Sequence, residues 1–212
     1  GARREPELQA LAEEMKAEGW QAEILPLDIT DRAATEGAVA ARPAFDVLVN
    51  SAGLARHSPA VDTTPEDYDA VTKLNVRAAY FLTRSVAKGL LAAGKPGSLI
   101  NITSQMAHVG GIDRAVYSAT KHAVEGMTKS MAIEWGPHGI RVNTIAPTFI
   151  RTALTAQTFA NPERAAWIAS KIKLGRVGEV EDIMGAVAFL ASDAAALVTG
   201  TSLVVDGGWT AD

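Results

Sequence analysis

Short apolar runs alternate along this chain with longer segments in which apolar residues recur every three or four positions. The short runs have the length of β-strands, and the longer segments have the period of amphipathic helices. Strands that alternate with helices predict a parallel sheet with helices on both faces. We therefore expect a doubly wound α/β fold in three layers, α/β/α, formed by one domain over residues 1–212.

The pattern places five strands and seven helices. The expected strands are residues 24–27, 45–50, 98–103, 140–146 and 202–205. The expected helices are an opening one that carries Leu8, Leu11, Ala12 and Met15 and ends at Gly19, then residues 32–41, 65–94, 115–135 and 179–191, with two shorter helices near 152–159 and 162–173.

Local signals support two of the helix starts. Thr64-Pro65-Glu66-Asp67 combines an N-cap hydroxyl, a proline at the first helical position and acidic residues in the first turn. Thr30 and Asp31 offer N-cap oxygens to the helix that follows them. The helix from Pro65 carries an apolar stripe of Tyr68, Val71, Leu74, Ala78, Phe81 or Leu82, and Val86.

Composition narrows the classes of function. The chain has 212 residues, 48% hydrophobic and 21% charged, with a net charge of -4 and no cysteine. This suits a globular α/β domain and excludes disulfide and thiolate chemistry. No basic block indicates a nucleic-acid partner, and no basic amphipathic or long apolar segment indicates a membrane. The four histidines form no metal-binding pattern, so we expect no metal, and the absence of cysteine fits a cytoplasmic protein.

Ser104, Tyr117 and Lys121 are the strongest candidates for chemistry. Tyr117 and Lys121 stand four residues apart on one helical face, and Ser104 ends the strand run before them. An ammonium beside a phenol favours the phenolate and so lowers its pKa, while a serine hydroxyl can hold a substrate oxygen. The three form a proton donor and acceptor for a carbonyl/alcohol pair. Taken alone, a Tyr-x-x-x-Lys pair is equally compatible with a half-exposed helix surface.

The order of polar residues along the whole chain favours the catalytic interpretation of this pair over the helix-surface one. The polar residues that follow one another in this order are Asp28, Asn50-Ser51-Ala52-Gly53, Asn75, Ser104, Tyr117, Lys121 and Pro147. This series carries a resemblance, from Gly1 to Trp209, to the short-chain dehydrogenase/reductase family, closest to its 3-oxoacyl-carrier-protein reductase and gluconate 5-dehydrogenase branch. It implies a Rossmann-type sheet and an NAD(P)-dependent oxidoreductase that transfers a hydride between nicotinamide and a ketone or secondary alcohol.

The resemblance assigns a catalytic tetrad. Tyr117 is the proton donor and acceptor, Ser104 orients the substrate oxygen, and Lys121 lowers the Tyr117 pKa and binds the nicotinamide ribose. Asn75 matches an asparagine at a helix irregularity, whose main chain holds a water that links Lys121 to solvent.

The resemblance also assigns cofactor contacts. Asp28 matches the acid at the adenine amino group, and Asn50, Ala52 and Gly53 approach the adenosine ribose. Pro147, Ile150 and Thr152 lie at the nicotinamide carboxamide, with Tyr117 and Lys121 at its ribose. Ala2 aligns with the acid that favours NAD, and the neighbouring Arg3 suits a 2′-phosphate. We therefore expect NADP, with NAD left open.

For the substrate, the resemblance points to Ser104, Gln105, His108 and Thr148, with Met106 beside them. Two departures from the family pattern are Ser51, where a second asparagine is usual, and Thr148, where glycine is usual. His57, His122 and His138 are expected to be solvated.

The family's first strand and its glycine-rich turn, Thr-Gly-x-x-x-Gly-x-Gly, do not occur in this sequence. That turn and the helix after it bind the cofactor pyrophosphate. Gly1-Ala2-Arg3-Arg4 looks like the end of the second strand. We expect about 35–45 further residues upstream, one βαβ unit.

Several alternatives remain open at this point. The fold could belong to a catalytically inactive dinucleotide-binding or scaffold protein. Within enzymes, an acyl-thioester ketone competes with a sugar acid or polyol as substrate. The resemblance further implies a homotetramer built through the two long helices and the C-terminal segment near Trp209.

Overall fold

A parallel four-stranded sheet forms the centre of the computed structural model, which describes residues 1–152 and 155–211. Its strands lie in chain order: β1 (Val47–Asn50), β2 (Gly97–Ile102), β3 (Ile140–Pro147) and β4 (Ser202–Val205). Since all neighbouring pairs are parallel, the carboxyl ends of the strands meet at one edge of the sheet. Ligands of open α/β sheets bind at this edge.

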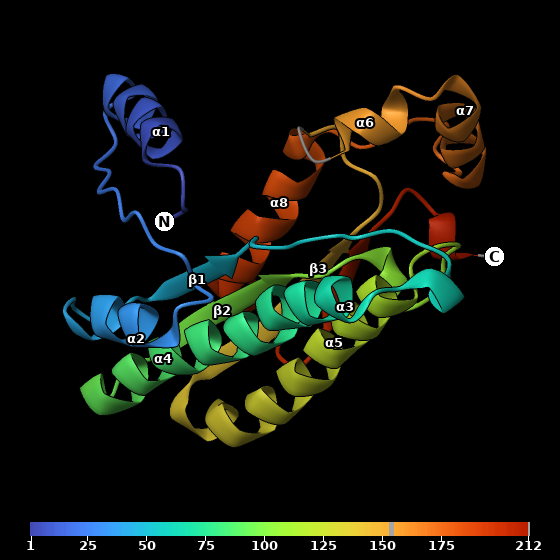
Figure 1. Cartoon of the computed structure of the whole chain (residues 1–212). Coiled ribbons are helices and arrows are strands. Elements are labelled where there is room, and N and C mark those ends of the chain that lie inside the picture. Colours follow the sequence, from blue (N-terminus) through green and yellow to red (C-terminus); the bar gives the residue numbers. More distant parts are fainter. Residues whose placement is uncertain (153–154, 212) are drawn as a thin grey trace.

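Helices cover both faces of the sheet, which confirms the doubly wound α/β prediction (Figure 1). α4 and α5 pack on one face and α8 on the other. The helices are α1 (Glu5–Ala17), α2 (Arg32–Ala40), α3 (Pro65–Thr72), α4 (Ala79–Ala93), α5 (Ala115–Trp135), α6 (Ala156–Phe159), α7 (Pro162–Lys171) and α8 (Val180–Ala191).

Two apolar clusters hold these layers together. Leu90 of α4 packs with Leu99 of β2 and Ile140 of β3, while Ile100 of β2 packs with Leu190 of α8 on the opposite face. Leu99 and Ile100 point to opposite faces because successive strand residues alternate. Both are fully buried, as a strand covered on both sides requires.

The predicted caps form as expected. Thr64 accepts a hydrogen bond from the Asp67 backbone N–H, and Asp31 accepts one from that of Ala34. Gly94 ends α4 in the left-handed conformation, with φ of +61°, which glycine adopts at little cost.

The first 27 residues form the predicted opening helix, α1, but not the predicted strand. Residues 24–27 form no strand; they make only an isolated bridge between Ala2 and Pro26. The reason is the absence, within the described part of the chain, of a further strand to extend that pairing. For the same reason Val47 and Val49 of β1 stay exposed, and α1 lies apart from the sheet and buries only Ala12 (Figure 1).

Two other elements also depart from expectation. The helix expected near 152–159 forms only over Ala156–Phe159, and residues 153 and 154 lie outside the described residues. The long helix expected over 65–94 is interrupted by a π-helical turn, η2 (Lys73–Ala78). This turn shifts the helical phase, so that Asn75 is buried and Leu74 is only partly so. None of the described helices is long and apolar enough to cross a membrane.

Candidate active site

A cavity of about 260 Å³ lies where β2 and β3 end. It brings together four of the predicted site residues: Ser104, Gln105, Tyr117 and Thr148. A larger surface groove of about 730 Å³ runs between α3, the π turn and the start of α5. Neither Ser104, Tyr117 nor Lys121 lines this groove. The smaller cavity is therefore the candidate active site.

Ser104 is fixed at the end of β2 by its own backbone. It caps the short 3-10 turn over Gln105–Ala107, where its Oγ accepts a hydrogen bond of 3.2 Å from the Met106 N–H. Its hydroxyl also bonds to the Tyr117 side chain, which stabilises the phenolate and acts to lower the pKa of Tyr117. The predicted serine–tyrosine pair is thus in contact.

Lys121 lies one helical turn beyond Tyr117 and is almost fully buried. Its Nζ is 5.6 Å from the centroid of the Tyr117 ring and donates a 3.0 Å hydrogen bond to the Ile102 carbonyl. Burial lowers the pKa of Lys121 to about 8, against the opposing effect of the Glu125 carboxylate. A Cβ at Gly53 would stand 3.7 Å from this Nζ, so the loop after β1 passes directly beside it.

The expected effect of Lys121 on Tyr117 needs correction. The pKa of Tyr117 is raised above its usual value because burial disfavours the phenolate more than Ser104 and Arg114 favour it. The groups that act to lower this pKa are Ser104 and then Arg114, and the Lys121 ammonium is not among them.

Asn75, in the π turn, forms hydrogen bonds to the loop after β1 and to α5. Its Oδ1 accepts from the Leu54 N–H, and its Nδ2 donates to the Leu54 carbonyl, each at 2.8 Å. The same Nδ2 lies 3.1 Å from Thr120 Oγ1, next to Lys121. The helix irregularity expected at this asparagine is present, and Asn75 joins the loop after β1 to α5.

The predicted cofactor residues follow the strand ends but are less enclosed. Asn50 is buried and bonds to Asn101 of β2 at 2.9 Å, while Ala52 and Gly53 are exposed. Asp28 is exposed; a hydrogen bond from the Thr30 backbone N–H, followed by weaker effects that include the charge of Arg3, lowers its pKa. Arg3 therefore lies close enough to Asp28 to act on its carboxylate.

The last predicted cofactor segment leads away from β3. Pro147 is the final residue of β3, Ile150 makes an isolated bridge to Gly178, and Thr152 is exposed. Thr155, which was not predicted, donates a 2.6 Å hydrogen bond to the Ile150 carbonyl and fixes this turn.

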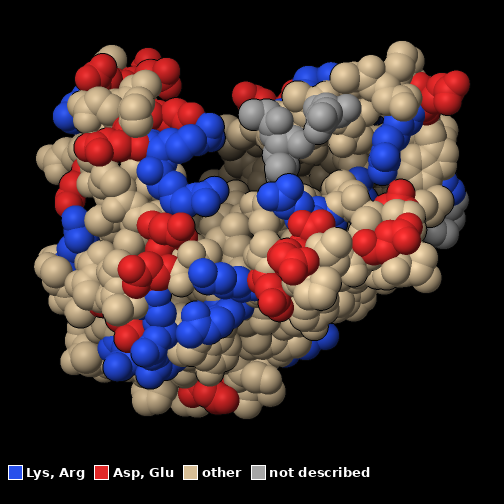
Figure 2. Space-filling model, viewed as in Figure 1, with Lys and Arg blue, Asp and Glu red and all other residues tan. Residues whose placement is uncertain are grey.

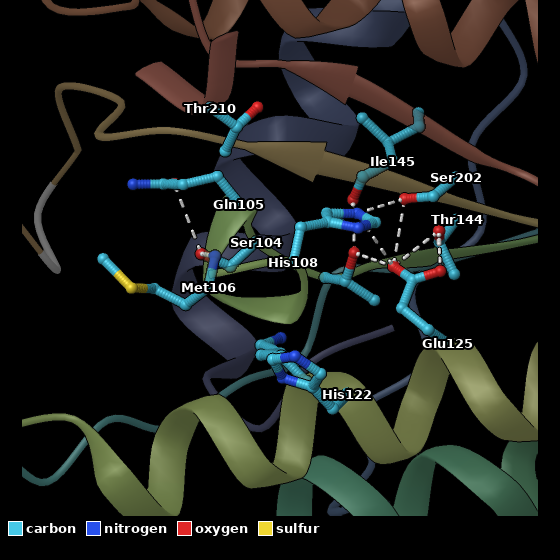
Figure 3. Close-up of polar contacts among 12 residues, drawn as sticks. Ser104, Gln105, Met106, His108, His122, Glu125, Thr144, Ile145, Ser202 and Thr210 are labelled. Atoms are coloured by element: carbon cyan, nitrogen blue, oxygen red, sulfur yellow. Dashed lines mark hydrogen bonds and ion pairs between the residues drawn. The ribbon is translucent and has the colours of Figure 1, made fainter. Parts of the chain in front are cut away.

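His108 is not a wall of the cavity, contrary to its predicted place beside the substrate. Its Nε2 lies 2.9 Å from Ser202 Oγ on β4, and Figure 3 shows Gln105 and Met106 pointing away from it. The 3-10 turn η3 (Gln105–Ala107) explains this result, because it directs Gln105 and Met106 into the cavity and His108 to the neighbouring strand.

Glu125 is a buried carboxylate that the sequence analysis missed. It accepts hydrogen bonds from Thr103, Thr144 and Ser202, and so joins α5 to β2, β3 and β4 (Figure 3). It stands four residues after Lys121 and raises the pKa of that ammonium. A glutamate on a helix is usually solvated, so no sequence signal distinguished this one.

Arg114 and His57 were also missed, and both line the cavity. Arg114 is the residue before α5 and is 8% exposed. Its Nη1 lies 2.5 Å from His57 Nε2, and its guanidinium sits 5.4 Å from the Phe149 ring centroid. His57 is exposed, as expected, but desolvation, with the added charge of Arg114, lowers its pKa to about 4, so this histidine is neutral at pH 7.

Comparison with known proteins shows which family the chain is similar to. The family described as enoyl-(acyl carrier protein) reductase matches residues 2–210. D-erythrulose reductase from Gallus gallus is 40% identical over 187 residues, which cover 88% of this chain and 76% of the relative. Gluconate 5-dehydrogenase from Gluconobacter oxydans is 37% identical over 199 residues, covering 92% of this chain and 77% of the relative.

The fold agrees with solved structures as well. A gluconate 5-dehydrogenase from Burkholderia cenocepacia, in complex with NADP and tartrate, superposes with a TM-score of 0.94 at 34% identity. The match covers 99% of this chain and 84% of the other.

The sheet, its carboxyl edge and the clustered hydroxyl, phenol and ammonium define an oxidoreductase of the nicotinamide-dependent class, acting on a ketone or secondary alcohol. The chain belongs to the short-chain dehydrogenase/reductase family.

Proposed function

We propose that this protein reduces or oxidises a small polyhydroxy compound with NADP, with Ser104, Tyr117 and Lys121 as its catalytic residues. The observation that carries the proposal is the convergence of these groups: Ser104 is bonded to Tyr117 in the cavity, and the Lys121 ammonium faces the same ring. The cofactor supplies the hydride acceptor or donor when it is bound.

The proton steps belong to this chain. Ser104 Oγ holds the substrate oxygen beside the Tyr117 hydroxyl, which gives its proton during reduction and takes one during oxidation. Because the Tyr117 pKa is raised, the phenol is protonated at neutral pH and ready to donate. Lys121 keeps a positive charge next to it, and Asn75 fixes the backbone through which the proton is replaced.

The residues at the sheet edge fit an NADP molecule. The exposed backbone of Ala52 and Gly53 allows close approach beside Asn50, and Pro147, Ile150 and Thr152 would face the nicotinamide. Arg3 would pair with a 2′-phosphate, and Asp28 would face the adenine. Basic side chains border the hollow between α1 and the rest of the chain (Figure 2), which suits a polyanionic cofactor.

The family model is described as an acyl-carrier-protein reductase, but the individual proteins similar to this chain favour a sugar-like substrate over an acyl-thioester. The relatives named above act on erythrulose and gluconate. The cavity has the volume of roughly nine water molecules, which suits a compact polar molecule.

Turnover tests the proposal. With NADPH and a panel of small ketoses and keto acids, we expect at least one substrate to be reduced, and reduction to disappear in Tyr117→Phe. Tight NADPH binding without turnover of any carbonyl compound would instead favour the alternative, an inactive dinucleotide-binding or scaffold protein.

We further propose a cytoplasmic homotetramer. The groove between α3, the π turn and α5 is partly apolar, with Tyr68 half exposed and Val116 and Ala123 along it. Such a groove fits a second copy of the same helices. Sedimentation checks this proposal, and a clean monomer at micromolar concentration would refute it.

A further inference from the structure

Arg114 carries a positive charge that the described part of the chain does not neutralise. It is 8% exposed, yet no carboxylate of residues 1–152 and 155–211 lies within ion-pair distance of it. Buried charges in proteins are normally paired, because removing an ion from water without a counter-ion is costly. The Arg114 guanidinium is therefore an exception to this rule within the described part of the chain.

The groups that do touch Arg114 bring no negative charge. His57 accepts one hydrogen bond from Nη1, and its low pKa keeps it neutral. The Phe149 ring offers only its quadrupole. Arginine has five N–H donors, and the remaining ones have no hydrogen-bond partner among the described residues. Two donors of a guanidinium fork match the two oxygens of a carboxylate.

The surroundings strengthen the local positive field. Arg164 of α7 acts electrostatically on both Arg114 and His57, and its effect on Arg114 exceeds that of Asp113. Burial and Arg164 lower the pKa of Arg114, as expected for a cation that lacks a counter-ion, but arginine stays protonated at neutral pH. The part of the cavity wall formed by Arg114 thus remains cationic.

We propose that Arg114 binds a carboxylate of the substrate, so that the enzyme acts on a hydroxy or keto acid of sugar size and disfavours the uncharged ketose. This inference rests on the proposed reaction at Ser104 and Tyr117. Those two residues receive the reacting oxygen, and Arg114, three residues before Tyr117 on the wall of the same small cavity, receives the acid group. The reacting carbon is then placed by two points of attachment instead of one.

Arg114 also has a second effect, because its charge acts to lower the pKa of Tyr117. A purely electrostatic role would affect all substrates alike, whereas carboxylate binding affects only the anionic ones. The ratio between matched charged and uncharged substrates separates the two roles.

The experiment compares keto acids with ketoses of similar size. Kcat/KM is measured with NADPH for 2-keto- and 5-keto-D-gluconate and D-fructuronate, and for D-fructose, L-sorbose and L-xylulose. We expect the parent protein to prefer an acid. In Arg114→Gln we expect kcat/KM for that acid to fall about 100-fold, the range for losing one partner of a buried charged hydrogen bond, while values for the ketoses change only a few-fold. Arg114→Lys should recover part of the loss.

Two further variants keep the result interpretable. His57→Glu leaves the Arg114 side chain in place but supplies an internal carboxylate, so it should lose the acid selectively even if Arg114→Gln does not fold. Arg84→Gln removes an equal charge outside the cavity, where Arg84 pairs with Glu36, and should leave the ratio unchanged.

A binding measurement stands apart from catalysis. By calorimetry with NADP present, D-gluconate should bind the parent protein at least about tenfold more tightly than D-glucitol, and this difference should vanish in Arg114→Gln. A parent protein that prefers a ketose over every acid, or an Arg114→Gln variant that loses acids and ketoses equally, would overturn the inference. No turnover of any compound together with Arg114-dependent gluconate binding would refute the proposed function but not the carboxylate site.

Discussion

The two halves of the candidate site lie along the same edge of the sheet but differ in how the chain holds them. On the catalytic half, Asn75, Ser104 and Lys121 are buried, and each is bonded to a neighbouring segment. On the cofactor half, Asp28, Ala52 and Gly53 are exposed, and Asp28 bonds only within its own turn.

This difference in burial determines how much each half contributes to the stability of the fold. Buried polar groups are held in place by the same packing that forms the core, so changing them alters stability as well as chemistry. Exposed loop residues contribute little to folding, and their geometry depends on the ligand they meet. Substitutions on the two halves should therefore fail in different ways.

The largest effect is expected for Tyr117→Phe. Loss of the hydroxyl removes the proton donor, and general acid–base groups contribute about 10² to 10⁴ in rate. We expect kcat to fall by at least about 10³, with the unfolding free energy changed by less than about 1 kcal/mol. Steady-state rates and urea unfolding check this; turnover that survives within a few-fold would mean that the phenol has another role.

Lys121→Met should abolish activity and yet stabilise the fold. Burial lowers the pKa of Lys121 from 10.5 to about 8, so holding its charge in the folded state costs up to about 3 kcal/mol below pH 8. The lost hydrogen bond to Ile102 offsets about 1 kcal/mol of the gain. We expect a net increase of about 1–2 kcal/mol at pH 7.

The pH dependence sharpens that test. Between pH 8 and 10.5 the unfolded chain holds the Lys121 proton more tightly than the folded one does, so the stability of the parent protein gains from this group as the pH rises. The advantage of Lys121→Met should shrink over this window. Urea unfolding at pH 7 and at pH 10 gives the comparison, and an equal advantage at both values would contradict the buried-charge explanation.

Glu125→Gln should change the pH dependence of kcat while leaving the fold largely intact. The neutral amide keeps an oxygen for the Thr103 and Ser202 hydroxyls but no longer supports the Lys121 ammonium, so the pKa of Lys121 falls below about 8. We expect the alkaline limb of the kcat profile for reduction to move to lower pH.

A matched control lies on the same helix. Glu134→Gln changes an exposed carboxylate near the end of α5 and should leave the profile unchanged. If the alkaline limb of the kcat profile lies at the same pH in both variants as in the parent protein, Glu125 does not act through Lys121.

The smallest effect is expected for Asp28→Asn on the cofactor half. Its carboxylate is exposed and its backbone hydrogen bond survives in the amide, so stability should change by less than about 0.5 kcal/mol. The KM for NADPH should rise a few-fold with kcat unchanged. A large loss of stability would show that the two halves do not differ in the way described above.

Sequence periodicity predicted the elements whose signals are local. The bounds of α5 and β4, and the caps at Asp31 and Thr64, follow from short-range patterns and were found as expected. Residues 24–27 were predicted wrongly because a strand needs a neighbour that periodicity does not report.

For the candidate site too, the sequence predicted the residues that local elements place and missed those that only the tertiary fold brings together. Ser104, Tyr117 and Lys121 come together because one strand end and one helix turn place them. Arg114 with His57, and Glu125 with Ser202, meet only through the tertiary fold, across 57 and 77 positions of sequence. The direction of His108 depended on a 3-10 turn that the apolar pattern does not encode.

The π turn over Lys73–Ala78 acts as a one-residue insertion in an otherwise regular helix. Deleting a single residue there would restore an uninterrupted α-helix and rotate everything before it by about 100° around the axis. Asn75 would leave its place between Leu54 and Thr120, although the helix itself would become more regular. Among sequences of this kind, an alignment gap at this point should therefore mark loss of function more reliably than many substitutions do.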